Sequence, residues 1–291
     1  MNASSKPLPY PFKRIAVAVA FSPRIEAILS EAKRLQEIFE AKIFLVHVGK
    51  KNLQEEQYLK HLTHRFGLEG EHTEILWKEG DPVEEILQVC EMHQIDLLVA
   101  GALEKESLLK YFMGSVARKL CRRAKCSILM LREPSLHSKP IRHIVVEGSD
   151  HPKTVDTIET GIYIARQCKA DKISVIQEED AKKLALIRSP ELSDNEAERQ
   201  KEKMTTEEAK RLEEIIKCTD CGKVEVKIEL LEGKPGFIIS RFAREHHADL
   251  LMLNSPDMKL GFIDRVFPHD IEYALADLPC DLLIVHSPSK A

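Results

Sequence analysis

One stretch of this sequence occurs twice. Residues 79–101 read EGDPVEEILQVCEMHQIDLLVAG and residues 232–254 read EGKPGFIISRFAREHHADLLMLN, two blocks of equal length that are offset by 153 residues. Both begin with Glu-Gly-x-Pro and carry Asp-Leu-Leu near their ends. Such a repeat limits the fold to two copies of one unit, each of which must bury its own hydrophobic face.

Length and composition agree with two globular units. The chain has 291 residues, of which 43% are hydrophobic and 31% charged, and its net charge of −4 gives no reason to expect nucleic acid or an anionic membrane as a partner. No apolar run is long enough to span a bilayer. The seven cysteines are scattered, and residues 1–14 lack the apolar core of a signal peptide. We therefore expect a reducing, cytoplasmic setting.

The first copy alternates short apolar runs with amphipathic segments. We expect buried strands at 14–21, 41–49, 72–80, 95–101 and 126–132, because these runs are apolar and rich in β-branched residues. Helical patterns lie between them at 22–40, 52–66, 82–94 and 114–123, and we expect 102–113 to be a loop with room for a helical turn. This order predicts an α/β fold with a doubly wound, five-stranded parallel sheet.

The second copy restarts after a polar segment that is bounded by two prolines, Pro134 and Pro140. We expect repeat one at 13–133, a linker at 134–140 and repeat two at 141–288. Aligning residues 20–22 with 147–149, an offset of 127, leaves about 26 extra residues in repeat two. We place this charged insert at 179–204, as an exposed helical arm or a mobile loop, before a helix at 205–217.

Several short motifs in this order resemble the universal stress protein family in its tandem, two-domain form. They are VAVAFSP, HV at 47–48, EGDPVEEIL, DLLVAGALE, MGSVARKL and AKCSILMLR. The resemblance covers both repeats. It implies that the two repeats form an intramolecular pseudo-dimer through their last strands, with CSILMLR beside CDLLIVH. Such pairing would cover two sheet edges.

The family resemblance also implies a nucleotide site in repeat one. Nucleotide-binding members carry Gly-x-x-Gly, nine residues, then Gly-Ser, because glycines and a helix N-terminus let backbone N–H groups approach a phosphate. Gly101 and the Gly114-Ser115 pair match, whereas Glu104 replaces the second glycine and Ala20 replaces an acidic anchor. The expected contacts to ATP or AMP, with Mg²⁺ only if ATP is bound, are Val48, Gly101, Gly114, Ser115 and Val116.

Repeat two departs further from that motif. Asn254 and Asp257 replace its first two glycines, and Pro268-His269 stand near the place of Gly-Ser. Glu147 retains a carboxylate at the end of the first strand of this repeat. We therefore expect at most one adenine-nucleotide site per chain.

For other reactive side chains, a structural role competes with a functional one. Cys218 and Cys221 have the spacing of half a zinc site or of a redox pair, but no second Cys-x-x-Cys accompanies them, so no metal ligand is assigned. His47 lies in an apolar strand and is expected to be a hydrogen-bonded structural histidine. No catalytic constellation emerges, and no catalytic residue is assigned.

These observations favour a ligand-sensing or scaffolding stress protein over an efficient enzyme. One alternative is a nucleotide-independent scaffold that recruits a protein partner through the 179–204 insert. Another is a weak ATPase that uses repeat one. The sequence is also compatible with a homo-dimer of two chains, in addition to the intramolecular pseudo-dimer.

Overall fold

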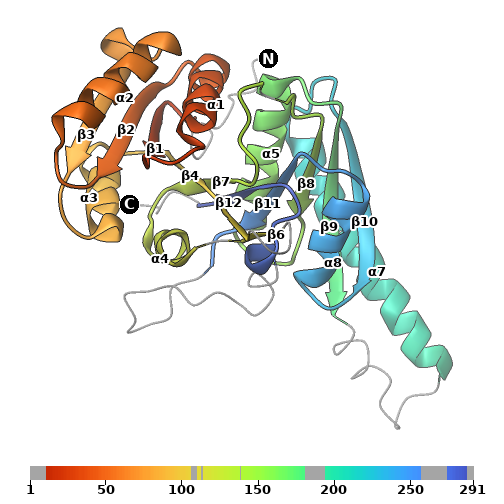
Figure 1. The fold of residues 1–291 in the computed structure, drawn as a ribbon. Coiled ribbons are helices and arrows are strands. Elements are labelled where there is room, and N and C mark those ends of the chain that lie inside the picture. Colours follow the sequence, from red (N-terminus) through yellow and green to blue (C-terminus); the bar gives the residue numbers. More distant parts are fainter. Residues whose placement is uncertain are drawn as a thin grey trace.

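The computed structural model describes residues 11–105, 110–112, 114–137, 139–180, 194–256 and 274–286. Its main feature is one ten-stranded sheet with the strand order β10-β9-β8-β11-β12-β7-β4-β1-β2-β3 (Figure 1). Repeat one supplies β1 (Arg14–Ala18), β2 (Lys42–Val48), β3 (Thr73–Lys78), β4 (Leu97–Gly101) and β7 (Ser127–Leu131). Repeat two supplies β8 (His143–Glu147), β9 (Lys172–Asp180), β10 (Glu225–Gly233), β11 (Leu250–Asn254) and β12 (Asp281–Val285). The two predicted five-stranded parallel sets are confirmed, and they join into a single sheet.

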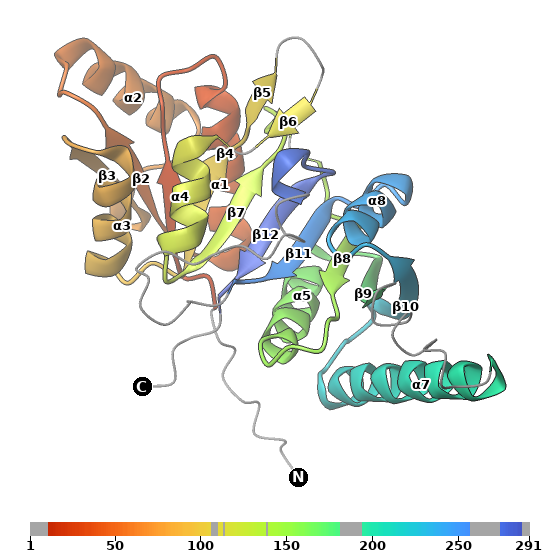
Figure 2. The ribbon, with the colours of Figure 1, turned by 90° about the horizontal axis from the view of Figure 1, so that it is seen from below.

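Helices cover both faces of this sheet (Figure 2). Repeat one contributes α1 (Ile25–Phe39), α2 (Leu53–Arg65), the short 3₁₀ helix η1 (Gly70–His72), α3 (Pro82–Met92) and α4 (Ser115–Arg123). Repeat two contributes α5 (Thr154–Cys168), α7 (Asp194–Cys218) and α8 (Phe237–Glu245). One hydrophobic core lies under α1, α2, α5 and α7, and a second lies under α3, α4 and α8. Because both faces are covered, the central strands are apolar throughout, as parallel strands require.

The strand registers fix how the two repeats correspond. Ile15 of β1 pairs with Leu97 of β4, and Ile144 of β8 pairs with Leu250 of β11. Leu97 and Leu250 are equivalent because the repeated blocks are offset by 153 residues. Ile15 and Ile144 are therefore equivalent too, so the first strands of the two repeats are offset by 129 residues. The offset of 127 from the sequence alignment is therefore wrong. Glu147 corresponds to Ala18, and Ser149 corresponds to Ala20. The alignment of Ser22 with Ser149 drew the sequence alignment two residues out of register.

The two repeats meet at an antiparallel seam between β7 and β12. Leu129 pairs with Leu283 at its centre, with the flanking pairs arranged symmetrically about this position. Two hydrogen bonds repeat this symmetry: His286 N donates to Ser127 Oγ at 3.1 Å, and Arg132 N donates to Asp281 Oδ1 at 2.8 Å. The predicted pairing of CSILMLR with CDLLIVH is confirmed, and it leaves neither last strand as an open edge.

Two segments differ from the sequence prediction. Residues 102–113 do not contain a helical turn in their described part. Instead, β5 (Leu103–Lys105) and β6 (Lys110–Phe112) pair as an antiparallel hairpin, which suits the aromatic residues of β6. The insert is shared between two elements, because β9 extends to Asp180 and α7 begins at Asp194. Residues 181–193 of the insert lie outside the described residues.

Figure 1 shows α7 extending beyond the body of the protein at one end of the sheet. Its C-terminal part packs on the sheet through the fully buried Leu212. Among the described helices, none is both long enough and apolar enough to cross a membrane.

Candidate functional site

The residues predicted to contact a nucleotide gather at one edge of repeat one. Val48 is the last residue of β2, and Gly101 is the last residue of β4. Gly114 is the N-cap of α4, so Ser115 and Val116 form its first turn. Because β2 and β4 run parallel to β1 between them, and α4 leads into the N-terminal end of β7, these residues all lie at the carboxyl edge of the sheet. Ligands of open α/β sheets bind at this edge.

Gly101 packs closely against α1. A Cβ atom built on Gly101 would lie 3.2 Å from Ile28 Cδ1, so a larger residue here would need space from α1. Both backbone polar groups of the next residue, Ala102, form hydrogen bonds. Ala102 N donates to Leu131 O, and Arg24 Nη1 donates to Ala102 O at 3.3 Å. The chain then enters the β5–β6 hairpin. Glu104 lies opposite Tyr111 in that hairpin, and its side chain lies outside the described residues.

An aromatic cluster stands at the ends of β1, β2 and β3. The His47 ring lies 4.7 Å from the Phe21 ring and 4.5 Å from the Trp77 ring, measured between centroids. His47 Nδ1 is 2.9 Å from Val19 O, and since a carbonyl only accepts, Nδ1 carries the proton. Trp77 Nε1 donates to Gly49 O at 2.9 Å. His47 is therefore a hydrogen-bonded structural residue, as the sequence predicted.

The same edge of repeat two holds a buried polar network. Asn254 is 5% exposed, and Thr154 and Thr157 are 0% exposed. Asn254 Nδ2 donates to Ser149 Oγ and to Thr154 Oγ1, both at 3.1 Å, while Thr157 Oγ1 donates to Asn254 Oδ1 at 2.6 Å. All the polar atoms of the Asn254 side chain are thus used within the repeat.

Glu147 completes this network at the end of β8. Its carboxylate accepts a hydrogen bond from Asn254 N at 2.8 Å and one from Ser149 Oγ at 2.6 Å. Burial raises the pKa of the Glu147 carboxyl, and the hydrogen bonds from Ser149 and Asn254 oppose that rise. The carboxylate therefore links β8 to β11.

The residues of this polar network in repeat two are replaced together by small or apolar residues in repeat one. With the offset of 129 for the first strand and helix, and 153 for the fourth strand, Ala18, Ala20, Ile25, Ile28 and Gly101 correspond to Glu147, Ser149, Thr154, Thr157 and Asn254. Sequence reasoning missed Thr154 and Thr157. Comparing the first helices at the correct offset would have found them, because threonine replaces isoleucine at two inward positions of one helix.

Two basic residues keep the same role in both repeats. Lys153 corresponds to Arg24, and Lys153 Nζ donates to Ser255 O at 2.8 Å, as Arg24 does to Ala102 O. In repeat two, Arg211 of α7 also reaches this edge and donates to Gly148 O at 2.8 Å. The loop after the fourth strand is thus anchored by a cation in each repeat.

The third helix of each repeat is capped in a different way. In repeat one, Asp81 Oδ1 accepts hydrogen bonds from Val83 N and Glu84 N, as an N-cap should. Repeat two has Lys234 at the corresponding position. There the carboxylate of Glu178, from β9, accepts from Gly236 N and Ile239 N at 2.9–3.0 Å. A side chain from a neighbouring strand thus replaces the local cap.

The cysteine pair lies away from both edges. Cys218 ends α7 and is exposed, and Cys221 Sγ lies 3.5 Å from Thr219 O. Burial raises the pKa of Cys221. Within the described part of the chain, no group of three or more His, Cys, Asp or Glu side chains is placed to hold a metal ion. Asp257, Pro268 and His269 lie outside the described residues.

Comparisons with known proteins agree with this fold. The Universal stress protein family profile matches residues 49–132 and 143–286, which is more than half of the chain. The universal stress protein MJ0531 of Methanocaldococcus jannaschii is 38% identical over 63 residues, which are 22% of this chain and 36% of the relative. The chain therefore spans about a third of the length of that curated relative.

Two solved structures match nearly the whole chain. The functionally unknown protein PA1789 of Pseudomonas aeruginosa PAO1 has a TM-score of 0.72 at 17% identity, covering 95% of this chain and 93% of that one. A universal stress protein of Archaeoglobus fulgidus has a TM-score of 0.68 at 13% identity, covering 95% and 99%. These likenesses show the fold. With the family match in both repeats, the chain belongs to the universal stress protein family as a tandem, two-domain member.

Proposed function

We propose that this protein senses an adenine nucleotide at the carboxyl edge of repeat one and binds none at repeat two. The observation that carries the proposal is the contrast between the two edges. In repeat one, the ends of β1 and β4 and the inward positions of α1 bear small or apolar residues, so among the described residues this edge holds no counterpart of the Asn254 network. In repeat two, the Asn254 network uses the same space.

The first turn of α4 would supply the phosphate contacts. Gly114 has no side chain, and it places no carboxylate or hydroxyl over the N–H groups of Ser115 and Val116. A side chain of this chain caps the first N–H groups of α2, α3 and α8, whereas α1 and α5, like α4, have no side-chain cap. An N-terminus left in this way favours an anionic group. Val48 and Gly101 would line the remainder of the site.

We further propose that the bound nucleotide acts as a signal rather than a substrate. Among the described residues, no group of three or more His, Cys, Asp or Glu side chains is placed to hold Mg²⁺, and the sequence contains no catalytic constellation. A nucleotide-independent scaffold is the second candidate, and the projecting α7 is the observation that favours it. Its partner would be a protein that contacts this charged helix. A cytoplasmic location remains part of the proposal.

Calorimetric titration of matched variants tests the nucleotide site. Gly114→Asp places a carboxylate where a phosphate would bind, so it should weaken AMP and ATP binding by at least about tenfold through charge repulsion. Gly222→Asp is the control, because it adds the same charge in an exposed turn whose φ of +60° an Asp tolerates. Equal binding by both variants, or no binding by the wild-type chain with or without Mg²⁺, would favour the scaffold instead.

A further inference from the structure

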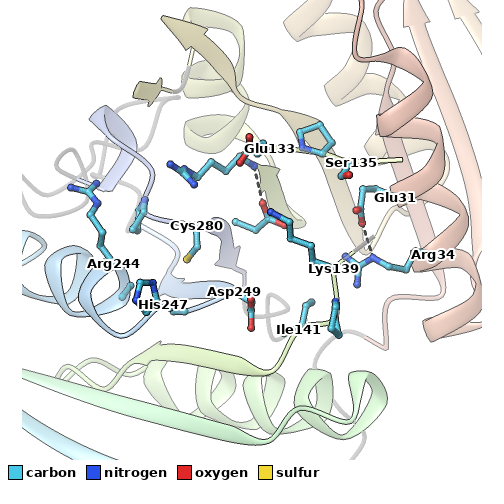
Figure 3. A pocket seen from close by; sticks show the side chains of 17 residues that line it. Glu31, Arg34, Glu133, Ser135, Lys139, Ile141, Arg244, His247, Asp249 and Cys280 are labelled. Carbon is cyan, nitrogen blue, oxygen red and sulfur yellow. Dashed lines mark hydrogen bonds and ion pairs between the residues drawn. The ribbon is translucent and has the colours of Figure 1, made fainter. Parts of the chain in front are cut away.

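A cavity of about 420 Å³ lies at the junction of the two repeats (Figure 3). It is on the side of the seam where β7 ends and β12 begins. Glu31 and Arg34 of α1 stand at one side of it, and Arg244 and His247 from the end of α8 stand at the other. The linker closes a further side through Glu133–Ser135 and Lys139–Ile141. Because the linker exists only in a tandem chain, a single repeat could not form this cavity.

The acidic side chains of the cavity are engaged by the protein itself. Glu31 Oε2 accepts from Arg34 Nε at 2.6 Å. Asp249 Oδ2 accepts from Arg142 N at 2.8 Å and from His143 N at 3.0 Å, and Asp281 Oδ1 accepts from Arg132 N. Asp249 has the same role as Asp96 in repeat one, whose Oδ2 accepts from Lys13 N and Arg14 N. Asp249 and Asp281 therefore hold strand ends together, Glu31 pairs within α1, and among the residues that line the cavity only Glu133 is an exposed acid.

Two of the basic side chains also have acidic partners within the chain: Arg34 pairs with Glu31, and Arg244 Nη2 lies 3.0 Å from Asp277 Oδ2. Lys139 and His247 are exposed at the cavity, and in the part of the chain that the structure describes neither forms an ion pair. The corresponding positions at the other end of the seam are mostly not basic. Arg34, Arg132, Arg244 and His247 correspond to Tyr163, His286, Glu91 and Gln94. The fold can thus be built without this set of side chains.

We propose that the junction cavity binds a small organic anion that carries carboxylate or phosphate groups. Lys139, Arg132 and His247 would contact its charged groups, and these residues come from the linker, the end of β7 and the end of α8. The volume lies within the range of small-molecule sites. A ligand in this position contacts both repeats, so its binding stabilises the whole chain. This site is separate from the carboxyl-edge site and does not depend on it.

Thermal unfolding with added anions provides the first test. Citrate and inorganic phosphate serve as probes of the two chemistries, and sodium chloride at the same ionic strength controls for screening. We expect one of the two anions to raise the Tm in a saturable way that chloride does not reproduce. The stronger of the two identifies the preferred group. Equal shifts with all three salts would overturn the proposal.

Matched variants then locate the binding. Lys139→Ala, Arg132→His and His247→Gln change the three proposed contacts, and the last two introduce the residues found at the corresponding seam positions, with Gln94 at a left-handed φ like that of His247. Together they should weaken the calorimetric affinity for the active anion by about tenfold or more. Lys125→Ala, which removes an exposed cation elsewhere, should leave it unchanged. Binding that survives the triple variant, or that Lys125→Ala weakens equally, would contradict the assignment. Gly114→Asp should not affect this site.

Discussion

At the scale of single residues, the two repeats show how one crevice can be kept open or filled. A side chain at Gly101 would meet Ile28 of the first helix, whereas Asn254 forms hydrogen bonds with Thr154 and Thr157 of the corresponding helix. A buried amide requires such partners, since an unsatisfied buried polar group costs about 1–3 kcal/mol. The exchange of one residue therefore requires the exchange of the others.

The first prediction concerns this coupling. Asn254→Gly alone should lower the free energy of unfolding by about 2–4 kcal/mol, because it leaves the buried hydroxyls of Thr154 and Thr157 with fewer partners. Adding Thr154→Ile and Thr157→Ile, which introduces the repeat-one set, should recover part of that loss. Urea unfolding of the single, double and triple variants measures the interaction energy. Strictly additive losses would contradict the account.

The second prediction concerns Asp281 at the seam. Burial raises the pKa of its carboxyl from 3.8 to about 6, so the folded protein binds more protons than the unfolded chain between these values. The resulting stability is fully present below about pH 4 and is lost as the pH rises through 6. Asp281→Asn keeps an oxygen for Arg132 N and removes the charge. It should therefore stabilise the protein at about pH 8 by roughly 1–3 kcal/mol, and much less at about pH 4. Parallel pH profiles of the two proteins in urea unfolding would be inconsistent with this.

At the scale of elements, the strands and helices could be predicted from the sequence because their apolar periodicity is strong. The ends and connections could not. The β5–β6 hairpin lies where a loop with room for a helical turn was expected, because two strands of three residues each show too little periodicity to be predicted. Likewise, the capping of α8 by Glu178 joins two segments that are far apart in the chain, and no local motif indicates it.

The third prediction follows from that cap. Glu178→Ala should destabilise the protein by about 1–2 kcal/mol, because the first N–H groups of α8 lose their acceptor and a negative charge near the helix N-terminus is removed. Glu179→Ala, at the next position of β9 and pointing to the other face, is the matched control and should have a smaller effect. Hydrogen exchange of the Gly236 and Ile239 amides should increase only in the Glu178 variant. Unchanged exchange would show that the cap does not protect this helix end.

At the scale of the whole molecule, the seam makes two repeats into one body. The sequence predicted which strands would meet, because the last strand of each repeat is apolar and otherwise exposed at an edge. It did not predict the polar partners across the seam, since Ser127 and Asp281 occupy equivalent positions with different chemistry. The filled edge of repeat two was predicted only as a loss of glycines, and its hydrogen-bonded network required the structure.

The fourth prediction tests the seam. A protease site introduced at 136–137 should allow the linker to be cut while the two fragments still elute together, because β7 and β12 bury each other. Leu283→Asp, at the centre of the seam, should let the cut fragments separate, whereas Lys227→Asp on the distant β10 should not. Separation of the cut wild-type fragments on size exclusion would mean that the linker, and not the seam, holds the repeats together.

The most direct test of the central claim is hydrogen–deuterium exchange of the full chain with and without saturating AMP. The account predicts slower exchange at the amides of Gly101 and Ala102 and of the first turn of α4, with no change at Asn254 and Ser255. Protection at repeat two, or no protection at either edge under conditions where AMP binds, would contradict a single nucleotide site in repeat one.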